Sequence, residues 1–174
     1  MKVNAPGLAV ICVLLVCVVA ISILSIEPTE EVLSEAIKVA EENFDNTTVE
    51  PNEETDRFSF YLPEEYDIEK QTKNNLILIR DDQTYILFYN ALEDRMSRLN
   101  YEAAKESDYT VLESFEKKDR FGYIHILEDE EEMLQLQIGV GGVKITTISE
   151  KGRLAEDAKQ MMLIANSIAY ENHQ

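Results

Sequence analysis

The longest apolar stretch of this chain runs from Leu8 to Ile26 and contains nineteen residues without a charged side chain. Ser22 and Ser25, near its far end, are its only polar side chains. A helix that rises about 1.5 Å per residue would be roughly 28 Å long here, close to the ~30 Å hydrocarbon core of a bilayer. The pattern therefore predicts a transmembrane anchor over residues 8–26, preceded by a short cytoplasmic N-terminus, residues 1–7.

A cleaved signal peptide is the alternative interpretation of this segment. Signal peptides have a basic start and an apolar stretch of about 7–15 residues before a small-x-small site, and Ala20-Ile21-Ser22 fits such a site. Here the stretch is longer, and Lys2 is the only basic side chain before it. Cys12 and Cys17 follow large side chains, which does not suit lipid attachment. We therefore expect an uncleaved single-pass anchor in the cell membrane with the C-terminal domain extracytoplasmic; after cleavage the domain would instead be secreted.

Apolar residues at helical spacing predict a helix from Thr29 to Phe44. Leu33, Ile37 and Ala40 lead to Phe44 at steps of four, three and four, which places them on one face. Thr29 suits the N-cap position. The helix could pack on the following domain or act as a stalk, and we assign residues 27–56 to a stalk helix and linker.

After the linker, the apolar period changes to two. Phe58, Phe60 and Leu62 alternate with smaller or polar residues before Pro63, which predicts a half-buried strand. Six further β-rich runs follow, and their short connections favour antiparallel neighbours. These runs cover residues 76–79, 84–89, 109–115, 121–127, 133–140 and 143–149, with a helical or irregular crossing over 91–106 and a closing helix over 153–169.

This order of elements predicts an α+β fold, in which an antiparallel β-sheet is flanked by helices. The predicted extracytoplasmic domain spans residues 57–170, followed by a tail over 171–174. A chain of this length is enough for one compact domain.

Two segments resemble the PsbP/Mog1-like fold family. The opening strand Phe58–Pro63 followed by Tyr66 is similar to that family's first strand, which runs into a proline and an aromatic residue. Val143–Ile148, followed by a helix that ends in Ile164–Ile168, is similar to its last strand and C-terminal helix. The resemblance covers about residues 57–170. It implies an αβα sandwich used for binding and assembly, as in accessory proteins of photosynthetic complexes, a small-GTPase release factor and bacterial envelope proteins, and it transfers no catalytic residue.

Charge and cysteine usage narrow the partners. The chain has 34 acidic and 16 basic side chains, a formal net charge of −18, and Lys2 is the only charged residue before Glu27. Nucleic acid is disfavoured as a partner because phosphate backbones are bound by clustered Lys and Arg. Both cysteines lie inside the predicted anchor, so the remainder has no disulfide or thiol chemistry, which suits a bacterial envelope.

Aromatic residues and one histidine are the candidate partner-binding residues. Tyrosine supplies a large contact area with few rotatable bonds, although strands also favour it for packing. His125 alternates with aromatic residues on one strand face, but no catalytic motif accompanies it, so we assign no catalytic residue. The candidates are Tyr61, Tyr66, Tyr85, Tyr89, Tyr123 and His125.

Acidic and glycine-rich runs suggest no cofactor. The run Glu128–Glu132 is rich in oxygen ligands, but consecutive acids point in different directions and lack the spacing of a calcium loop. We expect a solvated hairpin tip there and no metal site. Gly139–Gly142 lacks the lysine and helix of a phosphate loop, so a turn or bulge between strands is expected.

Taken together, these patterns predict a membrane-anchored extracytoplasmic domain that binds a protein or cell-envelope partner and is not an enzyme. The alternative is a membrane-tethered hydrolase or cation-dependent enzyme whose carboxylates come together only in the fold.

Overall fold

The computed structural model describes residues 29–45, 49–130 and 133–169, together with residues 11, 14 and 15. The predicted anchor over 8–26 lies largely outside the described residues, and the N-terminus over 1–7 and the tail over 171–174 lie wholly outside them. Within these described ranges, no helix has both the length and the apolar character needed to cross a bilayer.

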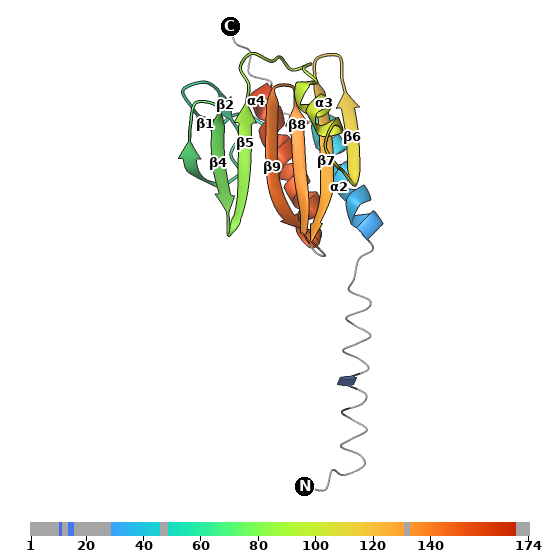
Figure 1. The fold of residues 1–174 in the computed structure, drawn as a ribbon. Coiled ribbons are helices and arrows are strands. Elements are labelled where there is room, and N and C mark those ends of the chain that lie inside the picture. Colours follow the sequence, from blue (N-terminus) through green and yellow to red (C-terminus); the bar gives the residue numbers. More distant parts are fainter. Residues whose placement is uncertain (1–10, 12–13, 16–28, 46–48, 131–132, 170–174) are drawn as a thin grey trace. The chain divides into compact units, whose positions relative to one another are not determined.

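A seven-stranded antiparallel sheet forms the centre of the domain (Figure 1). The predicted α+β class is therefore confirmed. Across the sheet the strands are β3 (Asp67–Gln71), β4 (Asn75–Arg80), β5 (Gln83–Tyr89), β9 (Val143–Glu150), β8 (Met133–Val140), β7 (Phe121–Glu130) and β6 (Val111–Glu116).

Two tight hairpin turns fix the register of the central strands. Asp81 has φ 52° in the two-residue loop between β4 and β5, and Gly141 has φ 54° in the loop between β8 and β9. Left-handed residues in two-residue loops match the twist of antiparallel strands. The predicted turn at Gly141-Gly142 is therefore confirmed. The acidic run lies at the predicted hairpin between β7 and β8, but β7 continues to Glu130 with a register shift after Glu128, so the strand takes up part of the run.

Three α-helices lie within residues 29–45, 49–130 and 133–169: α2 (Thr29–Asp45), α3 (Leu99–Lys105) and α4 (Leu154–Ala169). A 3₁₀ turn, Lys151–Arg153, leads into α4. The crossing predicted over 91–106 is helical only in its last part. Asp94 accepts a hydrogen bond from the Met96 N–H at 2.8 Å, and such side-chain bonds compete with helix formation.

From Val32 onward, helix α2 belongs to the compact unit, which therefore begins well before the boundary predicted at residue 57. Its apolar side is buried in the core, and the Phe44 ring lies 5.7 Å from the ring of Phe115 on β6. The Asn166 side chain on α4 donates to the Asn43 carbonyl at 3.0 Å. Because this helix completes the core, it packs on the domain. The alternative assignment of its residues to a stalk is therefore wrong.

Two strands differ from the predicted pattern. The predicted opening strand is reduced to β2 (Ser59–Phe60), which pairs with β1 (Glu53–Glu54) in a separate two-stranded sheet. Beyond it, the Tyr61 N–H donates to the Ser167 hydroxyl at 2.9 Å, so the backbone there bonds to α4 instead of to a strand. Strand β3 was not predicted, because all its residues are exposed and the sequence shows no apolar alternation there.

The main core lies between the sheet and the two long helices. Strand residues such as Leu87, Ile138 and Ile145 are fully buried in one cluster with α2 and α4. Helix α3 instead packs on the opposite face, where Ala104 joins a small second cluster with Phe121 and Tyr123. One face of the sheet is therefore covered by long helices, and the other by α3 at one corner.

Candidate functional site

The part of the second sheet face that no described helix covers is a candidate binding surface. Register places Ile77 of β4 beside Ile86 of β5, and Ile86 beside Thr146 of β9, which pairs on its other side with Gln137 of β8. We call the outward residues of these four strands the open face. Their outward side chains are Asn75, Ile77, Ile79, Thr84, Ile86, Phe88, Met133, Gln135, Gln137, Lys144, Thr146, Ile148 and Glu150.

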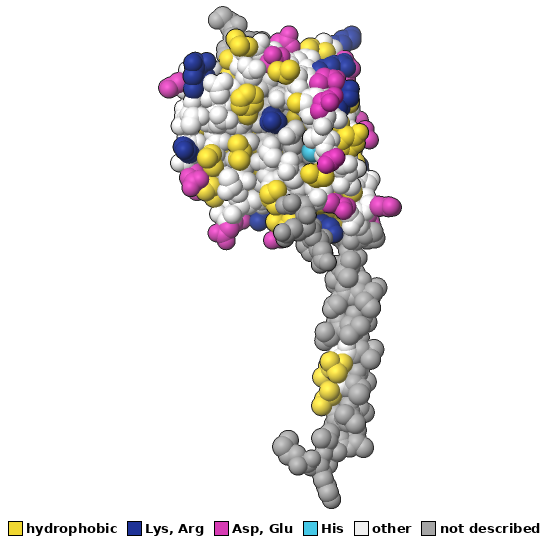
Figure 2. Space-filling view, viewed as in Figure 1, with side chains coloured by type: hydrophobic (Ala, Val, Ile, Leu, Met, Phe, Trp, Pro, Cys, Tyr) yellow, Lys and Arg dark blue, Asp and Glu magenta, His cyan; other side chains and the backbone are white. Residues whose placement is uncertain are grey.

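The open face combines exposed apolar side chains with few charges. Ile86 is 51% exposed and Ile148 is 39% exposed. Lys144 and Glu150 are the only charged residues in the set. Figure 2 looks onto this face, with apolar and neutral polar side chains across its middle and acidic side chains mostly at its margins. Exposed apolar surface bordered by polar residues is typical of interaction sites.

Helix α3 covers the corner of this face where two candidate residues lie. The Tyr101 ring stands 5.8 Å from the Tyr123 ring. The Tyr123 ring lies against Gly139, where an added Cβ would meet it at 2.1 Å. Gln137 donates to the Tyr123 hydroxyl at 2.6 Å, and burial raises the pKa of Tyr123 well above its usual value. Tyr123 is therefore a packed residue beneath α3 and the neighbouring loop.

His125 is also buried at this corner, with 3% of its surface exposed. Its Nε2 lies 3.1 Å from the Asp108 carbonyl oxygen, which only accepts, so Nε2 carries the hydrogen. The Ser107 hydroxyl lies 3.4 Å from this same nitrogen, which has no lone pair left to receive its proton. Burial lowers the pKa of His125, so the ring is neutral at neutral pH. This arrangement does not make Ser107 a nucleophile activated by His125.

A buried polar cluster on the helix-covered face centres on Asp157 of α4. The carboxylate forms an ion pair with Arg80 and accepts from the Tyr85 hydroxyl at 2.9 Å. Its second oxygen accepts from Gln83 at 2.8 Å and from Ser149 at 2.6 Å. Every one of these donors comes from the sheet. The cluster therefore ties α4 to the ends of strands β4, β5 and β9.

Tyr66 completes this cluster, because its hydroxyl accepts from Arg80 at 3.2 Å. Burial raises the pKa of Tyr66 to about 12 and that of Tyr85 further. Asp157 is fully buried, and Tyr66 is 3% exposed. Because its charged groups are buried, this network holds α4 to the sheet and offers no charged surface to a substrate.

The six candidate residues therefore do not share one groove. Tyr66 and Tyr85 lie in the buried cluster, and Tyr89 packs on the Phe58 ring at 4.7 Å in the core. Tyr123 and His125 are buried on the opposite sheet face, and Tyr61 alone is half-buried. For the buried tyrosines, packing inside the domain is the better explanation.

The open face itself was not singled out by sequence reasoning. A signal was present in β5, where Ile86 and Phe88 alternate with the buried residues Tyr85, Leu87 and Tyr89. Such a strand is apolar on both faces, although an antiparallel sheet with one solvated face normally alternates apolar with polar. That departure indicates a second apolar face.

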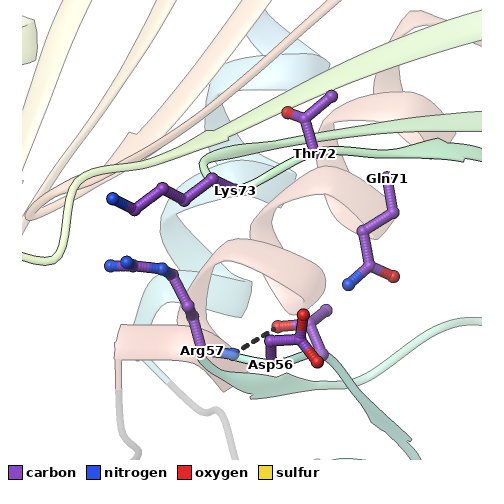
Figure 3. A pocket seen from close by; sticks show the side chains of 6 residues that line it. Asp56, Arg57, Gln71, Thr72 and Lys73 are labelled. Atoms are coloured by element: carbon purple, nitrogen blue, oxygen red, sulfur yellow. Dashed lines mark hydrogen bonds between the residues drawn. The ribbon is translucent and has the colours of Figure 1, made fainter.

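A separate pocket lies between two turns at one end of the sheet (Figure 3). Its volume is about 620 Å³. One wall is the turn after β1, and the other is the end of β3 and the turn that follows it. The lining residues are Thr55, Asp56, Arg57, Gln71, Thr72 and Lys73.

No group of three or more His, Cys, Asp or Glu side chains suited to a metal ion occurs within the described ranges. The part of Glu128–Glu132 from residue 131 lies outside those ranges. Comparison of the chain with protein-family profiles, with curated proteins and with solved structures finds no match.

Proposed function

We propose that this protein is a membrane-anchored, extracytoplasmic, non-enzymatic binding domain whose open face takes a protein partner. The observation that carries the proposal is the exposure of Ile86 and Ile148 on a sheet face whose only charged residues are Lys144 and Glu150. Burial of such side chains against a partner is favoured by about 25 cal/mol for each Å² of apolar surface removed from water.

Charge indicates what kind of partner fits. The chain carries a formal net charge of −18, and acidic side chains border the open face in Figure 2. Two copies placed face to face would bring like charges together at their margins, whereas a basic margin on another protein would be attracted. The partner that fits best is therefore a protein with an apolar centre and a basic rim.

The membrane location and the finer fold are parts of the same proposal. The apolar segment from Leu8 to Ile26 supports a transmembrane anchor by its length and lack of charge. Helices on both faces of an antiparallel sheet agree with an αβα sandwich of the PsbP/Mog1-like kind, although α3 has only seven residues. That family's use in binding and assembly agrees with a non-enzymatic role.

Photo-crosslinking in intact membranes tests the proposal. A photo-reactive amino acid replaces Ile86 in the full chain, and captured proteins are identified by mass spectrometry. We expect one protein to be captured reproducibly, and the second change Ile148→Lys to abolish its capture because it places a charge in the apolar contact.

Leu92 provides the matched control, because it is 93% exposed and lies in the loop after β5, outside the open face. The photo-reactive residue at position 92 is expected to capture nothing comparable, and Leu92→Lys is expected to leave capture from position 86 unchanged. Equal capture from both positions contradicts the proposal. Capture of a second copy alone would replace the proposed partner by self-association.

A further inference from the structure

Two cationic side chains line the pocket of Figure 3 without an acidic partner. Within the described ranges, no Asp or Glu oxygen lies within 4 Å of the charged nitrogens of Arg57 or Lys73. Four other arginines each have such a partner: Arg80, Arg98, Arg120 and Arg153. In the described part of the chain, Arg57 therefore differs from these four arginines in having no carboxylate at ion-pair distance, and Lys73 beside it in the pocket has none either.

The turns that carry these cations are held by their own hydrogen bonds. The Thr55 hydroxyl accepts from the Arg57 N–H at 3.2 Å and donates to the Phe58 carbonyl at 2.8 Å. In the second turn, the Thr72 N–H donates to the Asn75 carbonyl at 2.9 Å. Turns fixed in this way lower the entropy cost of positioning charges around a ligand.

The two cations extend toward the same side of the pocket (Figure 3). The Asp56 carboxylate points away from the Arg57 guanidinium, and the Gln71 amide extends toward the turn that carries Asp56. The pocket therefore has a cationic side and a side with a carboxylate and an amide. A ligand that matched both sides would carry a negative group and, beside it, a hydrogen-bond donor.

We propose that this pocket binds a small polar ligand through a phosphate or carboxylate group held between Arg57 and Lys73. The guanidinium presents paired donors that suit the oxygens of such groups, and the ammonium adds a second positive charge. Asp56 accepts a hydrogen bond from a hydroxyl or ammonium group on the same ligand. The volume of about 620 Å³ is in the range of small-molecule sites.

This site is independent of the proposed partner surface. The pocket is built from turns, and none of its six lining residues belongs to the open face. Loss of ligand binding here would leave partner capture through Ile86 unaffected, and the reverse also holds.

Nuclear magnetic resonance of the full chain in non-ionic detergent tests the site. The probes are inorganic phosphate, phosphoethanolamine, ethanolamine alone, and short-chain phosphatidylethanolamine. We expect phosphoethanolamine to shift the amide signals of residues 55–57 and 71–73 with saturation and a Kd on the order of 1 mM, more tightly than phosphate, and ethanolamine alone to have no effect. A tighter Kd for the lipid than for phosphoethanolamine assigns the group to a lipid headgroup, and a weaker one assigns it to a soluble ligand.

Substitutions locate the charges involved. Arg57→Gln and Lys73→Gln are each expected to weaken phosphoethanolamine binding about tenfold, the loss typical of one charge-assisted bond. Asp56→Asn should tighten inorganic phosphate and weaken phosphoethanolamine. Lys144→Gln on the open face is the matched control and should change Kd less than about twofold. Arg57 and Lys73 are exposed, so their replacement leaves the fold intact, which unchanged signals elsewhere will verify.

Two results overturn the inference. The first is a set of shifts that rises without saturation or lies outside the two turns, which indicates nonspecific attraction to an anion. The second is an equal loss of affinity in Lys144→Gln and Arg57→Gln, which indicates a response to net charge alone.

Discussion

Replacing Asp157 by asparagine removes the negative charge that balances Arg80 inside the domain. Both side chains are buried, with Asp157 fully so and Arg80 7% exposed. Asparagine keeps the shape but changes one carboxylate oxygen into an NH₂ group. If the NH₂ group replaces the oxygen that faces Arg80, it meets the guanidinium donor, and if it replaces the other oxygen, it meets the amide donor of Gln83. In either orientation one hydrogen bond becomes a contact between two donors.

The expected loss in the free energy of unfolding is about 3–5 kcal/mol, the cost of leaving a buried charge without its partner. A domain of this size has a total stability of about 5–15 kcal/mol, so the variant should be folded but weakened. With a slope of about 2 kcal/mol per molar urea, the unfolding midpoint should fall by about 2 M.

Urea unfolding of a fragment spanning residues 29–174, followed by far-ultraviolet circular dichroism and tyrosine fluorescence, measures this loss. The chain has no tryptophan, so tyrosine is the intrinsic probe. Asp81→Asn is the matched control, because its side chain is 76% exposed and pairs with Arg153 only at the surface. It should cost less than about 0.5 kcal/mol.

A double-mutant cycle with Arg80→Met separates charge from packing. If the unpaired guanidinium causes the loss, the double variant should be at least about 2 kcal/mol more stable than the sum of the single losses implies. A loss below about 1 kcal/mol for Asp157→Asn, or additive losses in the cycle, would refute the reasoning that this ion pair anchors α4.

Three further expectations concern glycine packing, pH and topology. Gly139→Ala should lower the free energy of unfolding in urea by about 1–3 kcal/mol, because the new methyl group meets the Tyr123 ring. Gly152→Ala places its methyl group with no atom within 4 Å and should leave stability unchanged, so equal effects of the two variants would contradict this reasoning. Because folding lowers the pKa of His125, stability should fall as pH drops below about 6.5, and His125→Gln should remove much of this loss. Because folding raises the pKa of Tyr66 to about 12, stability should also fall as pH rises above about 10. Unfolding midpoints measured from pH 5 to 11 test both. A cysteine at exposed position 114 (Ser114→Cys) should react with a membrane-impermeant maleimide on intact cells, and protection until lysis would contradict an extracytoplasmic domain.

Much of the fold followed from local patterns. The periods of 3.6 and 2 placed α2, α4 and the strands β4 to β9 close to their observed bounds, since one face of each of these elements is buried. The turn at Gly141-Gly142 followed for the same reason, whereas the observed β4–β5 loop is two residues, shorter than the four residues between the predicted runs. The prediction was incomplete where burial was absent, as in β3, whose five residues are all exposed.

The candidate site was harder to predict because alternation along a strand separates two faces without saying what covers each. Tyr85 and Ile86 are neighbours in sequence, yet Tyr85 is fully buried in the polar cluster under α4 and Ile86 is 51% exposed on the open face. Which of the two strand faces is buried depends on where the helices pack, and these helices are far from the strand in sequence.

The sequence by itself determined the class of elements, the strong negative charge and the apolar segment that suits an anchor. Only the tertiary structure decided that Asp157 pairs with Arg80, that α2 completes the core, that one sheet face stays open, and that Arg57 and Lys73 line one pocket. These are contacts between residues distant along the chain. Local patterns specify the direction of a side chain relative to its own strand or helix, whereas its neighbours depend on how the elements pack together.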